Sequence, residues 1–177
     1  MDFATVYSKL GYIPQQAFLF SGTIADNLRY GKEDATDAEL WEALDIAQAR
    51  DFVEKLPDGL ESMVSQNGTN LSGGQKQRLC IARAIVKKSE FYIFDDSFSA
   101  LDFITDSRLR ARLKNELSEA TVLIVAQRVG TIINADKIIV LDKGIIVGEG
   151  THAELLESCE VYKDIVKSQL SAEVAEQ

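Results

Sequence analysis

At Leu71-Ser72-Gly73-Gly74-Gln75, a serine and two glycines stand directly before a segment whose apolar residues recur at helical spacing. Ser72 and Gln75 form a capping box, so a helix is predicted to begin here. The glycines would let an anion approach the free amides of the first turn, where the helix dipole also favours negative charge. The stretch therefore predicts a helix start that contacts phosphate, with a plain serine-capped helix as the simpler alternative.

Strands alternate with helices on both sides of this stretch. Short apolar or β-branched runs predict strands, while capping boxes or apolar residues at helical spacing predict helices. The predicted strands are Leu10–Pro14, Phe91–Phe94, Thr121–Ala126, Lys137–Leu141 and Ile145–Val147, and the predicted helices begin near Thr36, Ser72, Ile104 and Thr151. This alternation indicates an α/β fold, a parallel sheet flanked by helices, whose ligands bind beyond the carboxyl ends of the strands.

The composition excludes several classes of function. The 177 residues carry a net charge of −9, which argues against a general nucleic-acid binder because such proteins need a basic surface. Two cysteines, Cys80 and Cys159, and the single histidine, His152, have no spacing typical of a zinc site. His152 lies in a capping box and is predicted to be a surface helix residue. No apolar run is long enough for a spanning helix, and no signal peptide is recognisable.

Four further places carry chemistry. Asp95 and Asp96 end a buried apolar strand, where a carboxylate can hold Mg²⁺ beside a nucleotide; an aspartate that caps the next turn is the alternative. Gln15 follows the strand Leu10–Pro14, and Gln127 follows the strand Thr121–Ala126, so both lie at predicted carboxyl ends. The last motif is Ser99-Ala100-Leu101-Asp102, shortly after the aspartates.

Taken together, these motifs resemble the ATP-binding domain of ABC transporters, and of their exporter branch in particular. Leu71–Gln75 matches the family's signature letter for letter, and Ser99–Asp102 matches its D-loop. Asp95 stands in the metal position of the Walker B strand. Leu10–Gln15 resembles the Q-loop, whose glutamine contacts Mg²⁺ and the attacking water. The segment Phe18–Gly31 looks like the exporter segment that faces the coupling helices of the transmembrane partner.

The resemblance covers essentially the whole chain and carries several expectations. It implies a P-loop NTPase-like ATPase fold with a helical signature subdomain at about residues 22–88, and with 1–21 and 89–177 forming the rest of the domain. It implies ATP and Mg²⁺ as cofactors. The signature residues and Asp102 would contact nucleotide, and Asp95 and Gln15 would contact the metal. It implies a second ATP-binding subunit and a transmembrane domain as partners, at the cytoplasmic face of the membrane, with no nucleic acid.

Four departures from the family pattern matter. The glycine-rich Walker A loop, which holds the phosphates, is expected before residue 1, together with the aromatic residue that stacks on adenine. Asp96 stands where the family has a catalytic glutamate, and Gln127 where it has a histidine. The shorter Asp96 carboxylate would fall about 1 Å short of the water, and glutamine cannot exchange a proton near neutral pH. Val64–Gly68 also replaces a segment that transmits between exporter halves.

The double substitution at Asp96 and Gln127 resembles the degenerate half of a heterodimeric exporter. In such a dimer the intact signature would complete the ATP site of the partner, while this chain alone would be inactive. Three alternatives are neutral drift at each position, a non-catalytic module that only lends its signature, and an ABC protein of translation or DNA repair. The exporter-like segment Phe18–Gly31 argues against the last of these.

The missing loop also predicts a property of the isolated chain. In the family's sheet, the Walker A strand lies between the strands that here end at Ala126 and begin at Lys137. Without it, two strand edges have no hydrogen-bond partner, and apolar faces around it are open to water. The chain alone is therefore predicted to be unstable or insoluble.

Overall fold

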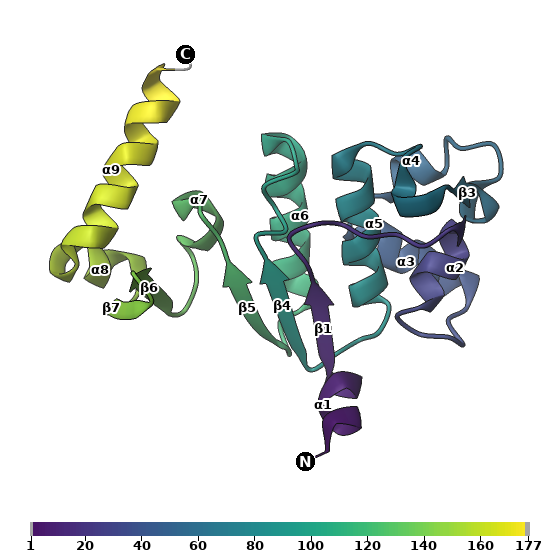
Figure 1. Ribbon diagram of the computed structural model, residues 1–177, viewed down its shortest axis with the longest axis horizontal. Helices are drawn as coiled ribbons and strands as arrows, with labels where there is room; N and C mark the ends of the chain where they lie inside the picture. The colour runs from purple at the N-terminus through teal and green to yellow at the C-terminus, as the bar shows by residue number, and fades with distance from the viewer. Residues whose placement is uncertain (1, 176–177) are drawn as a thin grey trace. The chain divides into compact units, whose positions relative to one another are not determined.

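The computed structural model describes residues 2–175, with side chains described for residues 2–169, and divides the chain into two compact units, Met1–Val125 and Ala126–Gln177 (Figure 1). Each unit has a hydrophobic core of its own. The predicted subdomain limits near residues 22 and 88 do not coincide with this division and stay a prediction.

A three-stranded parallel sheet forms the centre of the first unit. Its strands are β1 (Leu10–Ile13), β4 (Phe91–Asp95) and β5 (Thr121–Val125), in the order β1-β4-β5 (Figure 1). Because side chains alternate along a strand, one face of the sheet carries Ile13, Tyr92 and Phe94, which are all buried. They join one core with Leu79 of helix α5 (Gly73–Ile85) and Leu109 of helix α6 (Phe103–Glu116).

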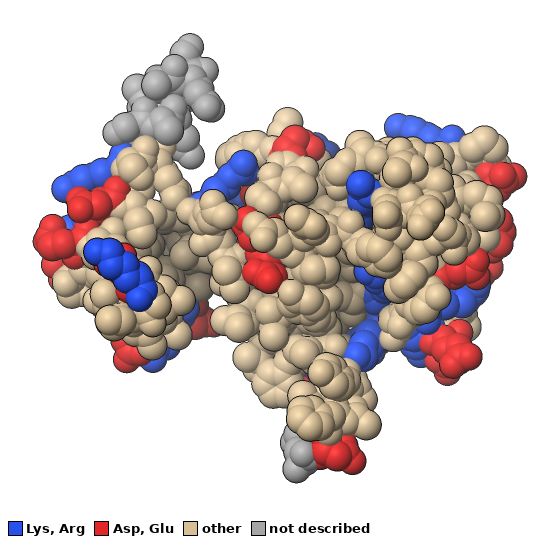
Figure 2. All heavy atoms as spheres, in the orientation of Figure 1, with Lys and Arg blue, Asp and Glu red and all other residues tan. Residues whose placement is uncertain are grey.

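The opposite face of this sheet is open. Tyr12 of β1, Phe91 of β4, and Leu123 and Val125 of β5 share it, and each is about half exposed. In Figure 2 the atoms over these strands are almost all uncharged, with a small acidic group where the strands end.

The helical part of the first unit surrounds α5. Helix α5 contacts α2 (Ile24–Arg29), α3 (Asp37–Ile46) and β1, while α4 (Arg50–Val53) contacts α3. A short antiparallel pair, β2 (Gly22–Thr23) with β3 (Met63–Val64), and two 3₁₀ turns, Gly59–Glu61 and Gln66–Gly68, complete this part. Helix α1 (Phe3–Lys9) precedes the sheet and buries none of its residues.

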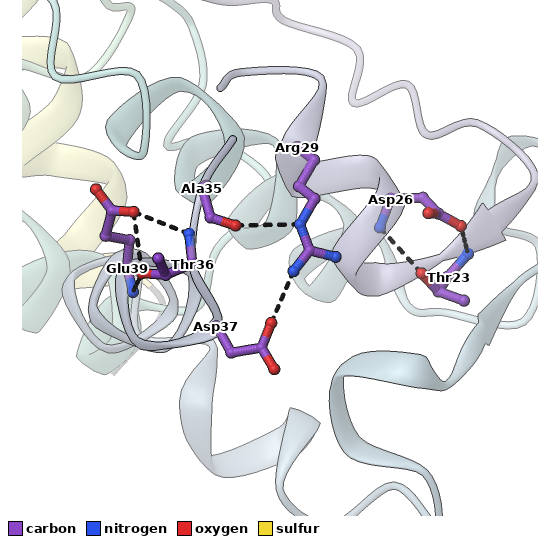
Figure 3. A network of polar contacts seen from close by, with 7 residues as sticks. All are labelled: Thr23, Asp26, Arg29, Ala35, Thr36, Asp37 and Glu39. Atoms are coloured by element: carbon purple, nitrogen blue, oxygen red, sulfur yellow. Dashed lines mark hydrogen bonds and ion pairs between the residues drawn. The ribbon is translucent and has the colours of Figure 1, made fainter. Parts of the chain in front are cut away.

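Capping boxes fix the starts of the helices. Thr23 with Asp26 begins α2, Thr36 with Glu39 begins α3, and Ser72 with Gln75 begins α5. Figure 3 shows the first two boxes and the Arg29 side chain between them, which donates hydrogen bonds to the Ala35 carbonyl at 3.2 Å and to Asp37 at 2.7 Å. Each box satisfies backbone N–H groups that a helix start leaves unpaired.

The second unit contains an antiparallel pair of strands and three helices. The strands β6 (Ile138–Asp142) and β7 (Ile145–Gly150) form a hairpin, and the helices are α7 (Val129–Ile132), α8 (His152–Ser158) and α9 (Glu160–Ala175). Val140, Leu155 and Tyr162 belong to its core. Within residues 2–175, no helix has the length and apolar character needed to cross a membrane.

Most predicted elements are confirmed, including the α/β class, the parallel sheet and every capping box named from the sequence. His152 begins α8, as predicted, but it is only partly exposed. Its ring is partly buried, and Nδ1 lies 2.8 Å from the Tyr162 hydroxyl. The capping box does place His152 at a helix start, but α9 then packs beside it, a contact that local sequence does not reveal.

Candidate functional site

Two carboxylates lie at the carboxyl end of β4, in the middle of the sheet. Asp95 is the last residue of the strand, and Asp96 follows it with a left-handed backbone, φ 45°. The Asp96 N–H donates to the Val125 carbonyl at 2.9 Å, so the turn after β4 is tied to β5. Aspartate tolerates this backbone region better than most residues do, because its short side chain can bond locally.

Both carboxylates accept hydrogen bonds from β1 or from the residues that follow it. The Tyr12 hydroxyl donates to Asp95 Oδ2 at 3.1 Å, and Gln15 Nε2 donates to Asp96 Oδ2 at 3.2 Å. The hydrogen bond to Asp95 is the main cause that raises the pKa of Tyr12. Parallel strands end at the same edge of a sheet, which is why side chains 81 or more positions apart meet here.

Buried polar groups hold this edge together. Ser97 is 1% exposed, and its hydroxyl donates to the Ile13 carbonyl at 2.9 Å and to the Asp95 carbonyl at 3.3 Å. Gln77 of α5 is also 1% exposed, and its Nε2 donates to the Pro14 carbonyl at 3.3 Å. The signature helix is therefore joined to the backbone just before Gln15.

The signature stretch forms the N-terminus of α5. Ser72 accepts from the Gln75 N–H at 3.3 Å and donates its own N–H to Gln75 Oε1 at 2.9 Å, while Leu71 is partly buried against the core. A side chain added at Gly73 would meet nothing within 4 Å, so open space lies beside this first turn. A side chain at Gly74 would lie 3.4 Å from the Ala100 carbonyl. The signature and the stretch Ser99–Asp102 are thus neighbours.

Asp102 is the N-cap of α6. Its Oδ1 accepts from the Thr105 N–H at 2.9 Å, and hydrogen bonds to Thr105, side chain first, lower the Asp102 pKa. One oxygen of the Asp102 carboxylate therefore caps the start of α6, and the side chain is otherwise exposed.

Gln127 belongs to the second unit, where it precedes α7 and is exposed. Its carbonyl accepts from Gln169 Nε2 at 2.6 Å, and Gln169 Oε1 accepts from the Val129 N–H at 2.8 Å. A side chain of α9 thus fixes the backbone that carries Gln127 and the start of α7. The structure brings Gln15, Asp95 and Asp96 together in the first unit, and describes Gln127 within the second.

An exposed aromatic group lies at the far end of α5 from the signature. The rings of Phe20 and Tyr30 stack with centroids 4.3 Å apart, and Phe18 meets Phe20 edge-on at 5.0 Å. The Arg83 guanidinium lies 5.8 Å from the Phe20 ring. Buried Asn27 holds the chain here, since its side chain both donates to the Phe20 carbonyl and accepts from the Phe20 N–H at 2.9 Å.

The residues at the β4 edge suit a magnesium ion bound together with a phosphate. Mg²⁺ prefers oxygen ligands, and it is commonly held by one or two carboxylates plus phosphate oxygens and water. Asp95 and Gln15 offer carboxylate and amide oxygens, and no group of three His, Cys, Asp or Glu side chains among the described residues could hold a metal without such help. The donor set therefore fits a metal–nucleotide complex better than a metal alone.

Sequence reasoning missed Tyr12, Ser97 and Gln77 as parts of this edge. Alternation placed Tyr12 on one face of its strand, but only the register Tyr12↔Ile93 sets it diagonal to Asp95. Ser97 would have needed the knowledge that β1 and β4 are neighbours, and Gln77 the knowledge that α5 packs against β1.

Comparisons with known proteins agree with this geometry. The family model described as "ABC transporter" matches residues 3–99. An uncharacterized ABC transporter ATP-binding protein of Mycobacterium bovis is 49% identical over 173 residues, which are 96% of this chain and 29% of that protein. An ATP-dependent lipid A-core flippase of Chromobacterium violaceum is 42% identical over 92% of this chain and 28% of its own length.

The fold has a close counterpart among solved structures. A bacterial Atm1-family ABC exporter with ATP bound superposes with a TM-score of 0.91 at 36% identity, covering 94% of this chain and 30% of that one. The chain thus spans less than a third of the length of the relatives cited.

Proposed function

Because the chain belongs to the ABC transporter family, we propose that it acts as ATP-binding machinery of an export transporter at the cytoplasmic face of a membrane. The observation that carries this proposal is the edge where β1 and β4 end, at which Gln15, Asp95 and Asp96 meet. Relatives named as a flippase and as a multidrug resistance ATP-binding and permease protein of Lactococcus lactis support the direction of transport.

Each group at the edge has a distinct task in this proposal. Asp95 would hold the metal directly or through water, and Gln15 would contact the metal and the attacking water. Bound Mg²⁺ supplies charge neutralisation on the phosphates. The open amides at Gly73 and the Ser72 hydroxyl contact the terminal phosphate of an ATP held by the partner subunit, and Asp102 lies beside them.

We further propose that the site at Asp96 is the weak one of an asymmetric pair. Asp96 is shorter than glutamate, and its Oδ2 accepts from Gln15, so the carboxylate is engaged with the loop. A base that is misplaced by about 1 Å loses on the order of 100-fold in rate. Gln127 can donate a hydrogen bond but cannot relay a proton near neutral pH. The partner's site, closed by the intact signature of this chain, would carry most of the turnover.

The aromatic group at Phe18, Phe20 and Tyr30 is the proposed contact with the transmembrane part. These three rings are exposed by 38% to 65%, and aromatic side chains are enriched where proteins associate. Gln77 and Arg83 lie on α5, the helix that begins at the signature. A movement of α5 would therefore displace both the signature and the helix end beside the aromatic group.

The test measures ATP hydrolysis by the full-length protein with its partner subunit, whose own catalytic glutamate is replaced by glutamine. Asp96→Glu together with Gln127→His should raise the residual turnover by roughly 10- to 100-fold. The control is Asp34→Glu, the same change on an exposed loop. No gain from the double variant would remove the asymmetric proposal, and no nucleotide binding by the full-length protein would remove the ATP-binding proposal itself.

The isolated chain gives a second, independent measurement. The Walker A loop is absent from residues 1–177, so this chain alone should neither bind Mg-ATP at micromolar concentration nor hydrolyse it. Tight binding in an equilibrium titration would show that the remaining groups suffice, and would contradict the role assigned to the loop.

A further inference from the structure

Tyr12 lies on the open face of the sheet, diagonal to Asp95. It pairs in register with Ile93, and Asp95 stands two residues further along β4 on the same face. Diagonal neighbours on one face of two adjacent strands lie within reach of a long aromatic side chain such as tyrosine. The Tyr12 hydroxyl lies 3.1 Å from Asp95 Oδ2.

Burial does not force this contact. Tyr12 is 53% exposed, so its hydroxyl could bond to water instead. A hydrogen bond from a phenol to a carboxylate is charge-assisted, and bonds of this kind are stronger than neutral ones. The hydrogen bond therefore orients the Asp95 side chain through a specific interaction.

The backbone around the pair is firmly held. β1 and β4 pair over four consecutive residues, and the buried Ser97 hydroxyl joins the Ile13 carbonyl to the turn after Asp95 at 2.9 Å. The separation of Tyr12 and Asp95 is thus fixed by the sheet, and both side chains meet without rearrangement of a loop.

We propose that Tyr12 is a positioning residue for the metal position of this site. Its hydroxyl holds Oδ2 of Asp95 and leaves Oδ1 to face the metal or a water bound to it. This inference rests on the metal-holding role proposed above for Asp95. Groups that hydrogen-bond a metal ligand commonly change metal affinity by 10- to 100-fold when they are removed.

The experiment measures Mn²⁺, used as a spectroscopic substitute for Mg²⁺, in the full-length protein with a non-hydrolysable ATP analogue. Tyr12→Phe removes only the hydroxyl and should weaken Mn²⁺ binding by about tenfold, read from the free Mn²⁺ signal in electron paramagnetic resonance. Affinity for the analogue without metal should not change. The matched control is Tyr7→Phe on α1, which is 64% exposed, and it should bind Mn²⁺ like the wild type.

The possible outcomes are distinct. Equal or tighter Mn²⁺ binding by Tyr12→Phe, with normal metal-free nucleotide affinity, would overturn the role of Tyr12 and leave the proposed function standing. Wild-type protein that binds no Mn²⁺ with the analogue would overturn the metal role of Asp95, and the inference about Tyr12 with it. A tenfold loss in Tyr12→Phe alone supports the proposal, and Asp95→Asn should then lose still more.

Discussion

A single buried hydroxyl joins the two strand ends that carry the candidate site. Ser97 is almost fully buried and donates to Ile13, so Ser97→Ala leaves a carbonyl without this donor. Loss of such a bond should lower the free energy of unfolding by about 1–2 kcal/mol. Urea unfolding measures this free-energy difference, in the longest form of the protein that unfolds reversibly.

Ser99 supplies the control for this residue. Its hydroxyl also donates to a backbone carbonyl, that of Asp96 at 2.9 Å, but it is exposed. Because water can replace that bond, Ser99→Ala should change stability by less than about 0.5 kcal/mol. Equal losses in the two variants would mean that burial of Ser97 adds nothing.

At the residue scale, the sequence predicted identities better than contacts. The metal position of Asp95 and the loop position of Gln15 follow from motif spacing and remain proposals. The hydrogen bond between Gln15 and Asp96 joins residues 81 positions apart and depends on strand order, which no local pattern contains. The left-handed backbone at Asp96 is a local reason for an aspartate at this position, because left-handed φ/ψ values disfavour glutamate more than aspartate.

In the first turn of helix α5, the effect of a substitution on stability can be distinguished from its effect on phosphate binding. Gly73→Ala adds a methyl group into open space in the first turn, so stability should stay within about 1 kcal/mol of the wild type or rise. The same methyl group would occupy the space proposed for a phosphate, so turnover at the partner's site should fall. Denaturant unfolding and ATP hydrolysis of the assembled transporter measure the two effects.

Gly31→Ala is the contrasting variant. A side chain at Gly31 would stand 2.0 Å from the Arg83 carbonyl of α5, a backbone atom that cannot move aside. We expect a loss of more than about 2 kcal/mol. If Gly73→Ala were as unstable as Gly31→Ala, its loss of activity would say nothing about phosphate.

Glu39 of helix α3 should make the stability of the fold depend on pH. A hydrogen bond from Lys32, followed by those from Thr36, lowers the pKa of Glu39 from 4.5 to about 2. Because the folded pKa is lower than the unfolded one, Glu39 stabilises the fold above pH 4.5, and this contribution is lost as the pH falls toward about 2. Glu39→Gln should therefore be less stable at pH 7, and its difference from the wild type should shrink below pH 4.5.

Thermal unfolding of Glu39→Gln and wild type between pH 7 and pH 2.5 follows this difference. Glu42→Gln is the matched change on the same helix, where the carboxylate lies 3.7 Å from Lys88 and caps no backbone N–H. A stability gap for Glu39→Gln that stays constant through acid pH would contradict the role of its charge.

Element prediction succeeded where two signals coincide. Helices α3, α5 and α8 combine a capping box with apolar residues at helical spacing, and each begins where the sequence indicates. Helix α1 carries Phe3, Val6 and Tyr7 at helical spacing but buries none of them, and its seven residues form too short a run to stand out in the sequence. The pair β2–β3 has only two residues in each strand, so no local pattern reveals it.

The whole first unit has one covered and one open sheet face. Leu123 and Val125 are exposed by 54% and 50% on the open face, beside Tyr12 and Phe91. Exposed apolar patches on a sheet with an unpaired edge promote association. The isolated chain should therefore form oligomers or aggregates at micromolar concentration.

Replacement of Leu123 and Val125 by threonine tests the source of that association. Threonine keeps the preference for a strand while it removes apolar surface, so the double variant should shift the chain toward monomer in sedimentation velocity. Met63→Thr, at a 66% exposed site of β3 away from this face, should have little effect. A monomeric wild-type chain with a cooperative thermal transition would show that the open face is harmless, and that the fold needs no further strand beside β5.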